Sequence, residues 1–132
     1  YSTTGDGLIA GSGDAAIEAA LQALRQTLKD RTQLATSIGY GPRFLHSTGQ
    51  LHKGDAGKGL FLQFTDDPVA DTPIPDAPGS PTSTMSFGVL IAAQALGDGQ
   101  ALLDASRTVL RIHLGQNPQA GLDQVRQTLA SS

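Results

Sequence analysis

Apolar residues recur at helical spacing near the start of the chain. Ile17, Leu21, Leu24 and Leu28 follow one another every three or four residues, and polar residues fill the positions between them. This spacing places the apolar side chains on one face of a helix. The pattern predicts an amphipathic helix of roughly four turns that begins at Asp14, whose carboxylate can cap the helix. We expect its apolar face to pack against the core.

The same spacing returns in the second half of the chain. Phe87, Leu90, Ile91 and Ala95 predict a helix over residues 86–96. The glycines that follow in Gly-Asp-Gly predict a break, and then a short second helix over residues 98–107.

A further helix is predicted at the C-terminal end. Asn117 is a suitable N-cap, Pro118 fits the first helical position, and Leu122, Val125 and Leu129 share one face.

Three stretches have the composition of strands. Residues 34–40 are small or β-branched, whereas residues 59–65 and 109–114 are mostly apolar. Since residues 59–65 are apolar almost throughout, we expect a strand covered on both faces. In the third stretch Arg111 and His113 are two residues apart in a mostly apolar strand. A histidine in such a position is usually hydrogen-bonded in the core or at the end of the strand.

Helices and strands therefore alternate as in an α/β domain, most simply a small parallel-rich sheet between helical layers. Residues 1–13 are rich in glycine and small polar residues, and they predict an irregular segment before a domain over residues 14–132. Five of the seven prolines fall within residues 66–84, which predicts an extended surface connection inside that domain.

Composition narrows the function classes. The 132 residues suit one domain, and a net charge of −3 gives no basic field for nucleic acid or an anionic membrane surface. Without cysteine there is no disulfide or thiolate metal site, as is common in cytoplasmic proteins. No apolar run approaches the ~20 residues that span a bilayer. We therefore expect a cytoplasmic protein, and a chain that begins at Tyr1 suggests part of a larger one.

Residues 39–54, which we call the glycine-rich run, concentrate the candidate chemistry. They read Gly-Tyr-Gly-Pro-Arg-Phe-Leu-His-Ser-Thr-Gly-Gln-Leu-His-Lys-Gly. Glycines let a backbone turn tightly and approach a ligand. A polar surface loop is the other interpretation. A zinc site is disfavoured because His46 and His52 are six residues apart with no carboxylate cluster. Residues 54–59 also lack the Ser or Thr of a Walker A loop.

The glycine-rich run resembles a motif of the phosphoglucose isomerase family, in particular the C-terminal part of bacterial transaldolase/glucose-6-phosphate isomerase fusion proteins. In that family a histidine in a Gly-x-x-x-x-His arrangement acts in ring opening, followed closely by Gln-Leu. Gly41 and His46 match this spacing, and Gln50-Leu51 follows. The resemblance implies a sugar-isomerase (SIS-like) fold, no cofactor, and a homodimer or a fusion with an upstream domain.

The resemblance assigns the catalytic role to His46. Substrate-binding roles for a sugar phosphate are expected at Arg43, Ser47, Thr48, Gln50 and Lys53, and no metal ligand is expected. The family's base is a glutamate in a Glu-Ser-x-Gly-Lys-like motif, which is missing here, and Glu18 is the only glutamate. Many members also carry a lysine where this chain has alanine in residues 87–94.

Two functions are therefore predicted from the sequence. The first is the C-terminal portion of a glucose-6-phosphate isomerase of central carbohydrate metabolism, active only in the complete protein. The second is a non-catalytic sugar-phosphate-binding or assembly module.

Overall fold

The computed structural model describes residues 12–41, 54, 59–68 and 70–131. Its elements follow the order α1 (Ser12–Thr32), β1 (Leu60–Thr65), β2 (Pro73–Ile74), β3 (Met85–Ser86), α3 (Phe87–Asp104), β4 (Thr108–His113) and α4 (Pro118–Ser131). The expected mixture of helices and a small parallel sheet is confirmed. None of the helices in the described part of the chain is long and apolar enough to cross a membrane.

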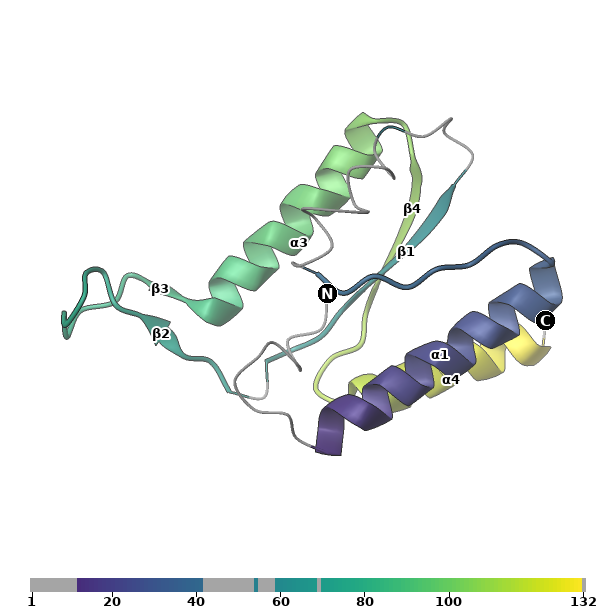
Figure 1. The fold of residues 1–132 in the computed structure, drawn as a ribbon, viewed down its shortest axis with the longest axis horizontal. Helices are drawn as coiled ribbons and strands as arrows, with labels where there is room; N and C mark the ends of the chain where they lie inside the picture. Colours follow the sequence, from purple (N-terminus) through teal and green to yellow (C-terminus); the bar gives the residue numbers. More distant parts are fainter. Residues whose placement is uncertain (1–11, 42–53, 55–58, 69, 132) are drawn as a thin grey trace.

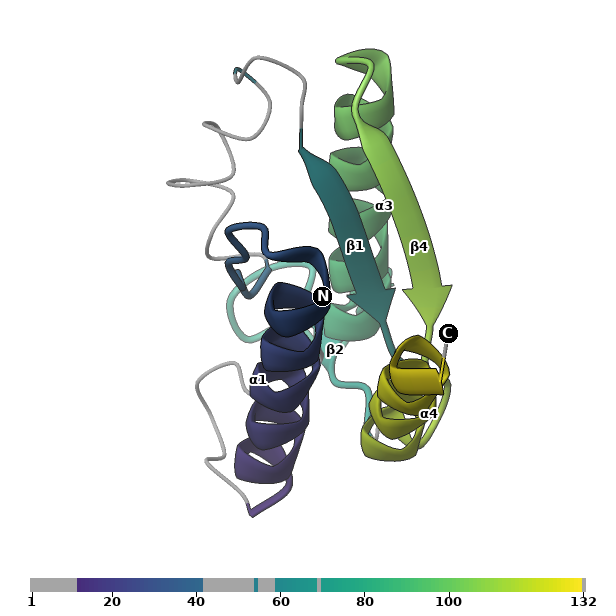
Figure 2. The same ribbon diagram turned by 90° about the vertical axis from the view of Figure 1, so that its right-hand side faces the viewer.

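The sheet consists of β1 and β4, which pair in parallel with Leu60 opposite Thr108 and Thr65 opposite His113. The connection between the two parallel strands runs through α3, which lies along one face of the sheet (Figures 1 and 2). Side chains alternate between the faces of a strand, so Gln63 and Phe64 face opposite sides. Gln63 bonds to α3, whereas Phe64 packs with α1 and α4.

The apolar core lies mainly between α1 and α4, which run side by side (Figure 1). Leu24 of α1 and Leu122 of α4 are almost completely buried, and Ile17 joins them. Phe64 and Leu114 connect this helix pair to the sheet. The predicted apolar faces of both helices are therefore confirmed.

The start of α4 also forms as predicted. Pro118 is its first residue, and the Ala120 backbone N–H donates to Asn117 Oδ1 over 3.1 Å. This is the geometry of an N-cap, in which a side-chain oxygen satisfies a backbone donor of the first turn.

The prediction of two helices separated by a glycine break is wrong, because α3 runs without interruption from Phe87 to Asp104. The Ser86 hydroxyl caps it by accepting from the Val89 N–H at 3.2 Å. Gly97 and Gly99 lie inside the helix, where glycine costs about 1 kcal/mol relative to alanine. Packing of the apolar side chains of Ala95 and Leu102 in buried positions offsets this local cost.

The prediction of a strand over residues 34–40 is also wrong. Gln33 adopts a left-handed backbone conformation, with φ of 57°, and its N–H donates to the Lys29 carbonyl at 2.8 Å. This ends α1 and redirects the chain, leaving Leu34 66% exposed. Residues 34–40 join neither described sheet, which shows that β-branched composition without a pairing partner does not make a strand.

The proline-rich connection contains a small antiparallel ladder that the sequence did not predict. β2 pairs with β3 through Pro73 opposite Ser86 and Ile74 opposite Met85. The Asp76 carboxylate accepts bonds from both the backbone N–H and the hydroxyl of Thr84, each at 2.8 Å. The other described residues of the connection are mostly exposed, as expected, but the chain turns at residues 76–79, where the Ser80 N–H donates to the Ala77 carbonyl at 2.9 Å. The prediction that the whole connection is extended is therefore wrong there.

Candidate functional site

The residues predicted to form the site lie outside the described part of the structure. This applies to the catalytic candidate and to all five substrate-binding candidates: Arg43, His46, Ser47, Thr48, Gln50 and Lys53. The structure does describe the chain on either side. Gly41 is buried in a turn, and Gly59 leads into the amino end of β1. The expected delivery of the run by a preceding strand is therefore wrong, because the strand follows it.

Tyr40, at the beginning of the glycine-rich run, lies close to α1. Burial raises the pKa of its hydroxyl, and the negative charge of Glu18 raises it further. The only glutamate of the chain is thus near the segment that leads into the run. Glu18 itself is exposed on α1, as predicted for a solvated helix face.

A row of polar side chains occupies the face of the sheet that packs on α3. In register, Gln63 of β1 lies opposite Arg111 of β4, and Thr65 lies opposite His113. Each opposed pair is hydrogen-bonded through its side chains. We call Gln63 and Arg111 the inner pair, and Thr65 and His113 the outer pair.

The inner pair is fixed by α3. The Gln63 amide donates to the Ala95 carbonyl at 2.9 Å, and Gln63 Oε1 accepts from Arg111 Nε at 2.7 Å. Arg111 Nη2 also approaches the Ala95 carbonyl at 3.4 Å. Because Gln63 is only 7% exposed, its amide oxygen depends on the guanidinium for a partner.

Gly99 makes room for this arrangement. A Cβ atom at Gly99 would collide with Arg111 Nη2 and come within 2.9 Å of Gln63 Oε1. The helix can therefore approach the guanidinium only where it has no side chain.

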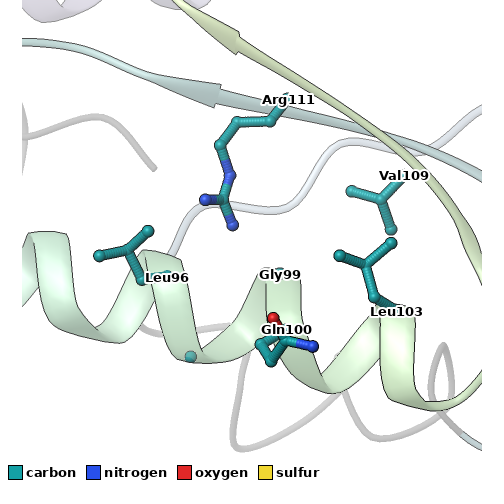
Figure 3. A pocket seen from close by; sticks show the side chains of 7 residues that line it. Leu96, Gly99, Gln100, Leu103, Val109 and Arg111 are labelled. Atoms are coloured by element: carbon teal, nitrogen blue, oxygen red, sulfur yellow. The ribbon is translucent and has the colours of Figure 1, made fainter.

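Beside the inner pair, α3 and β4 enclose an open groove with a volume of about 490 Å³. We call it the α3/β4 groove. The Arg111 guanidinium points from the strand toward α3, while Leu103 and Val109 approach each other farther along (Figure 3). Its lining is Leu96, Gly97, Gly99, Gln100, Leu103, Val109 and Arg111. The positively charged Arg111 guanidinium therefore lies in a groove whose walls are mainly apolar.

The outer pair continues into a carboxylate. Thr65 Oγ1 lies 3.0 Å from His113 Nδ1, and His113 Nε2 lies 3.3 Å from Asp67 Oδ1. These residues stand at the carboxyl ends of parallel strands, where α/β sheets commonly bind ligands. The Asp67 carboxylate can therefore orient the imidazole ring of His113. With the His113 side chain 56% exposed, the strand-end interpretation fits the structure.

Sequence reasoning missed the Gln63–Arg111 pair, although a signal was present. Gln63 and Thr65 are polar residues two positions apart in an apolar strand, and Arg111 and His113 repeat this spacing. Polar residues with period two inside a covered strand share one face and need partners there. Which strands paired, and in which register, could not be read from the pattern.

The amino end of α3 is already occupied by a carboxylate. Asp71 accepts bonds from the Ser86 hydroxyl and from the Gly88 N–H at 2.7 Å. These two bonds, led by that from Ser86, lower the pKa of the Asp71 carboxyl. This helix end therefore binds a side chain of its own chain.

Within the described residues, no three His, Asp or Glu side chains gather in a way that could hold a metal ion. Comparison with known proteins finds no matching family model, no matching curated protein and no matching solved structure.

Proposed function

We propose that this chain is the C-terminal portion of a glucose-6-phosphate isomerase, which interconverts glucose 6-phosphate and fructose 6-phosphate. The observation that carries the proposal is the glycine-rich run, in which His46 follows Gly41 by five residues and Gln50-Leu51 comes next. The α/β architecture is compatible with a sugar-isomerase fold. A transaldolase domain ahead of the chain is part of the same proposal.

The reaction needs three kinds of group. Ring opening needs a proton donor and acceptor that titrates near neutral pH, and His46 has that chemistry. The enediolate formed between C1 and C2 needs positive charge or hydrogen-bond donors, which Arg43, Lys53 and Gln50 can supply. Ser47 and Thr48 carry hydroxyls suited to phosphate oxygens. No cofactor takes part.

The proton transfer between C1 and C2 also needs a base, for which a carboxylate is usual. Glu18 is the only glutamate, and it lies on the exposed face of α1 next to Tyr40 rather than in an enclosed site. We therefore assign the base to a part of the complete protein outside this chain, either an upstream domain or a second subunit.

The same observation supports a second candidate, a sugar-phosphate-binding or assembly module without catalytic activity. Such a module would contain the glycine-rich run, but neither an upstream domain nor a second subunit would supply the catalytic base. Turnover by the complete protein distinguishes the two candidates.

The test is a coupled assay of fructose 6-phosphate conversion by the complete protein. The isomerase proposal predicts turnover that His46→Ala strongly reduces. A folded complete protein that binds fructose 6-phosphate without turnover supports the module. A protein that neither binds nor converts it contradicts both.

A further inference from the structure

We propose that the open edge of β4, together with the α3/β4 groove, binds an extended segment of a partner protein that carries a carboxylate. This inference depends on the surface between α3 and β4, and it does not depend on the isomerase activity. Three features of that surface support it: a strand edge that no other described strand pairs with, exposed apolar walls, and an arginine side chain fixed by hydrogen bonds.

The first feature is the edge of the sheet. Among the described elements β4 pairs only with β1, and Figure 2 shows its other side uncovered. The Leu114 N–H donates to Thr65 O at 2.7 Å, so it points toward β1. Because these directions alternate along a strand, the backbone N–H and C=O groups of Val109, Arg111 and His113 point away from β1. They can pair with an added strand.

The second feature is the apolar wall. Leu96 and Leu103 of α3 flank the groove and are 59% and 51% exposed. Val109 faces them from β4. An added strand would lie about 4.8 Å from β4 and bring its α3-facing side chains against these residues. The added strand would therefore cover the apolar surface of α3 that β4 leaves exposed.

The third feature is the charge of Arg111. Its Nε is bound to Gln63 and its Nη2 approaches Ala95, so the guanidinium is fixed before any partner arrives. Within the described part of the chain, no carboxylate forms an ion pair with Arg111. Asp104 of α3 accepts a hydrogen bond from the Gln100 side-chain amide at 2.8 Å. The outer N–H groups of the guanidinium are suited to a partner carboxylate.

The spacing of these features defines the partner. Val109 and Arg111 are two residues apart on one face of β4, so the matching strand has an apolar residue and an acidic residue two positions apart. We infer an extended segment of a partner protein with the pattern apolar residue, any residue, acidic residue.

A suitable probe is the capped peptide Thr-Val-Thr-Glu-Thr-Val-Thr, whose symmetric pattern suits either strand direction. Its matched control replaces Glu with Gln. Binding to the 132-residue chain is followed by amide chemical shifts and by hydrogen exchange. We expect shifts at Gly99, slowed exchange at Val109 and Arg111, and about tenfold tighter binding of the Glu peptide.

Variants of exposed residues separate charge from folding. Leu103→Glu places a negative charge in the groove and should abolish the preference for the Glu peptide, whereas Leu103→Lys should keep it. Val89→Glu is the matched control, because Val89 is an exposed residue of α3 that does not line the groove. It should bind like the unmodified chain.

Several results would overturn the proposal. One is equal affinity for the Glu and Gln peptides, and another is no binding at millimolar peptide by the folded chain. A further contradicting result is loss of the preference for the Glu peptide in both Leu103→Glu and Leu103→Lys, because charge would then not determine that preference. If hexanoate shifts Gly99 while the peptide leaves exchange at Val109 and Arg111 unchanged, the groove binds small carboxylates instead.

Discussion

Replacing Gly99 with alanine tests how the inner pair and α3 depend on each other. The added methyl group would collide with Arg111 Nη2 and approach Gln63 Oε1. The guanidinium is the end of a flexible side chain beside an open groove, so it can swing away without distorting the backbone. The cost is then the hydrogen bond from Arg111 Nε to Gln63, which leaves a buried oxygen unpaired.

The magnitude follows from two opposing effects. Loss of a hydrogen bond to a charged group costs about 1.5–3 kcal/mol. Alanine favours an internal helical position over glycine by about 1 kcal/mol. Gly99→Ala should therefore destabilise the fold by about 1 kcal/mol. Gly97→Ala is the matched control, because a Cβ at Gly97 meets nothing within 4 Å and should stabilise the fold by about 1 kcal/mol.

The assay is urea unfolding followed by circular dichroism. The two alanine variants should differ by about 2 kcal/mol in the free energy of unfolding. In an Arg111→Ala background the difference should shrink, because the colliding group and its hydrogen bond are already absent. Equal stability of Gly99→Ala and Gly97→Ala in the unmodified background would refute this account of the inner pair.

Three further predictions concern stability and activity. Asp71→Asn should destabilise the fold at neutral pH. The lowered pKa of Asp71 in the folded state means that its stabilisation is present above the unfolded value near 3.8 and is lost as the pH falls through the folded value. Unfolding curves of the two proteins should therefore converge in acid, and a constant gap would contradict this. Leu122→Ala should cost about 3 kcal/mol in urea unfolding, while exposed Leu96→Ala should cost less than about 0.5 kcal/mol; equal losses would place the core elsewhere. The isolated 132-residue chain should fold by circular dichroism yet show no turnover of fructose 6-phosphate, and turnover abolished by His46→Ala would show that it carries its own base.

Local patterns predicted two of the described helices, α1 and α4, well. The apolar spacing around Leu24 and Leu122 identified α1 and α4, and Asn117 identified a cap, because these signals depend on neighbours within a few residues. Residues 59–65 were correctly predicted to form a strand, which is β1 (Leu60–Thr65) in the structure. The glycines at positions 97 and 99 wrongly predicted a break in the helix. At Gly99 the close approach of Arg111, from a strand distant in sequence, explains why the residue is glycine.

Tertiary pairing could not be predicted from the sequence. Residues 34–40 have strand composition, but no partner in the described sheets. The inner pair joins positions 48 residues apart, and its existence depends on the register of β1 with β4. Composition and spacing do not contain that register. The roles assigned to Arg43, His46, Ser47, Thr48, Gln50 and Lys53 remain predictions from the resemblance.

The central claim is that His46 opens the ring of a sugar phosphate in an isomerase. The most direct test compares His46→Ala with the unmodified complete protein on a cyclic substrate and on an open-chain analogue. General acid–base catalysis contributes about 10²–10⁴-fold, so turnover of the cyclic substrate should fall by that factor. Turnover of the open-chain analogue should change much less. Equal losses on both substrates would contradict the claim.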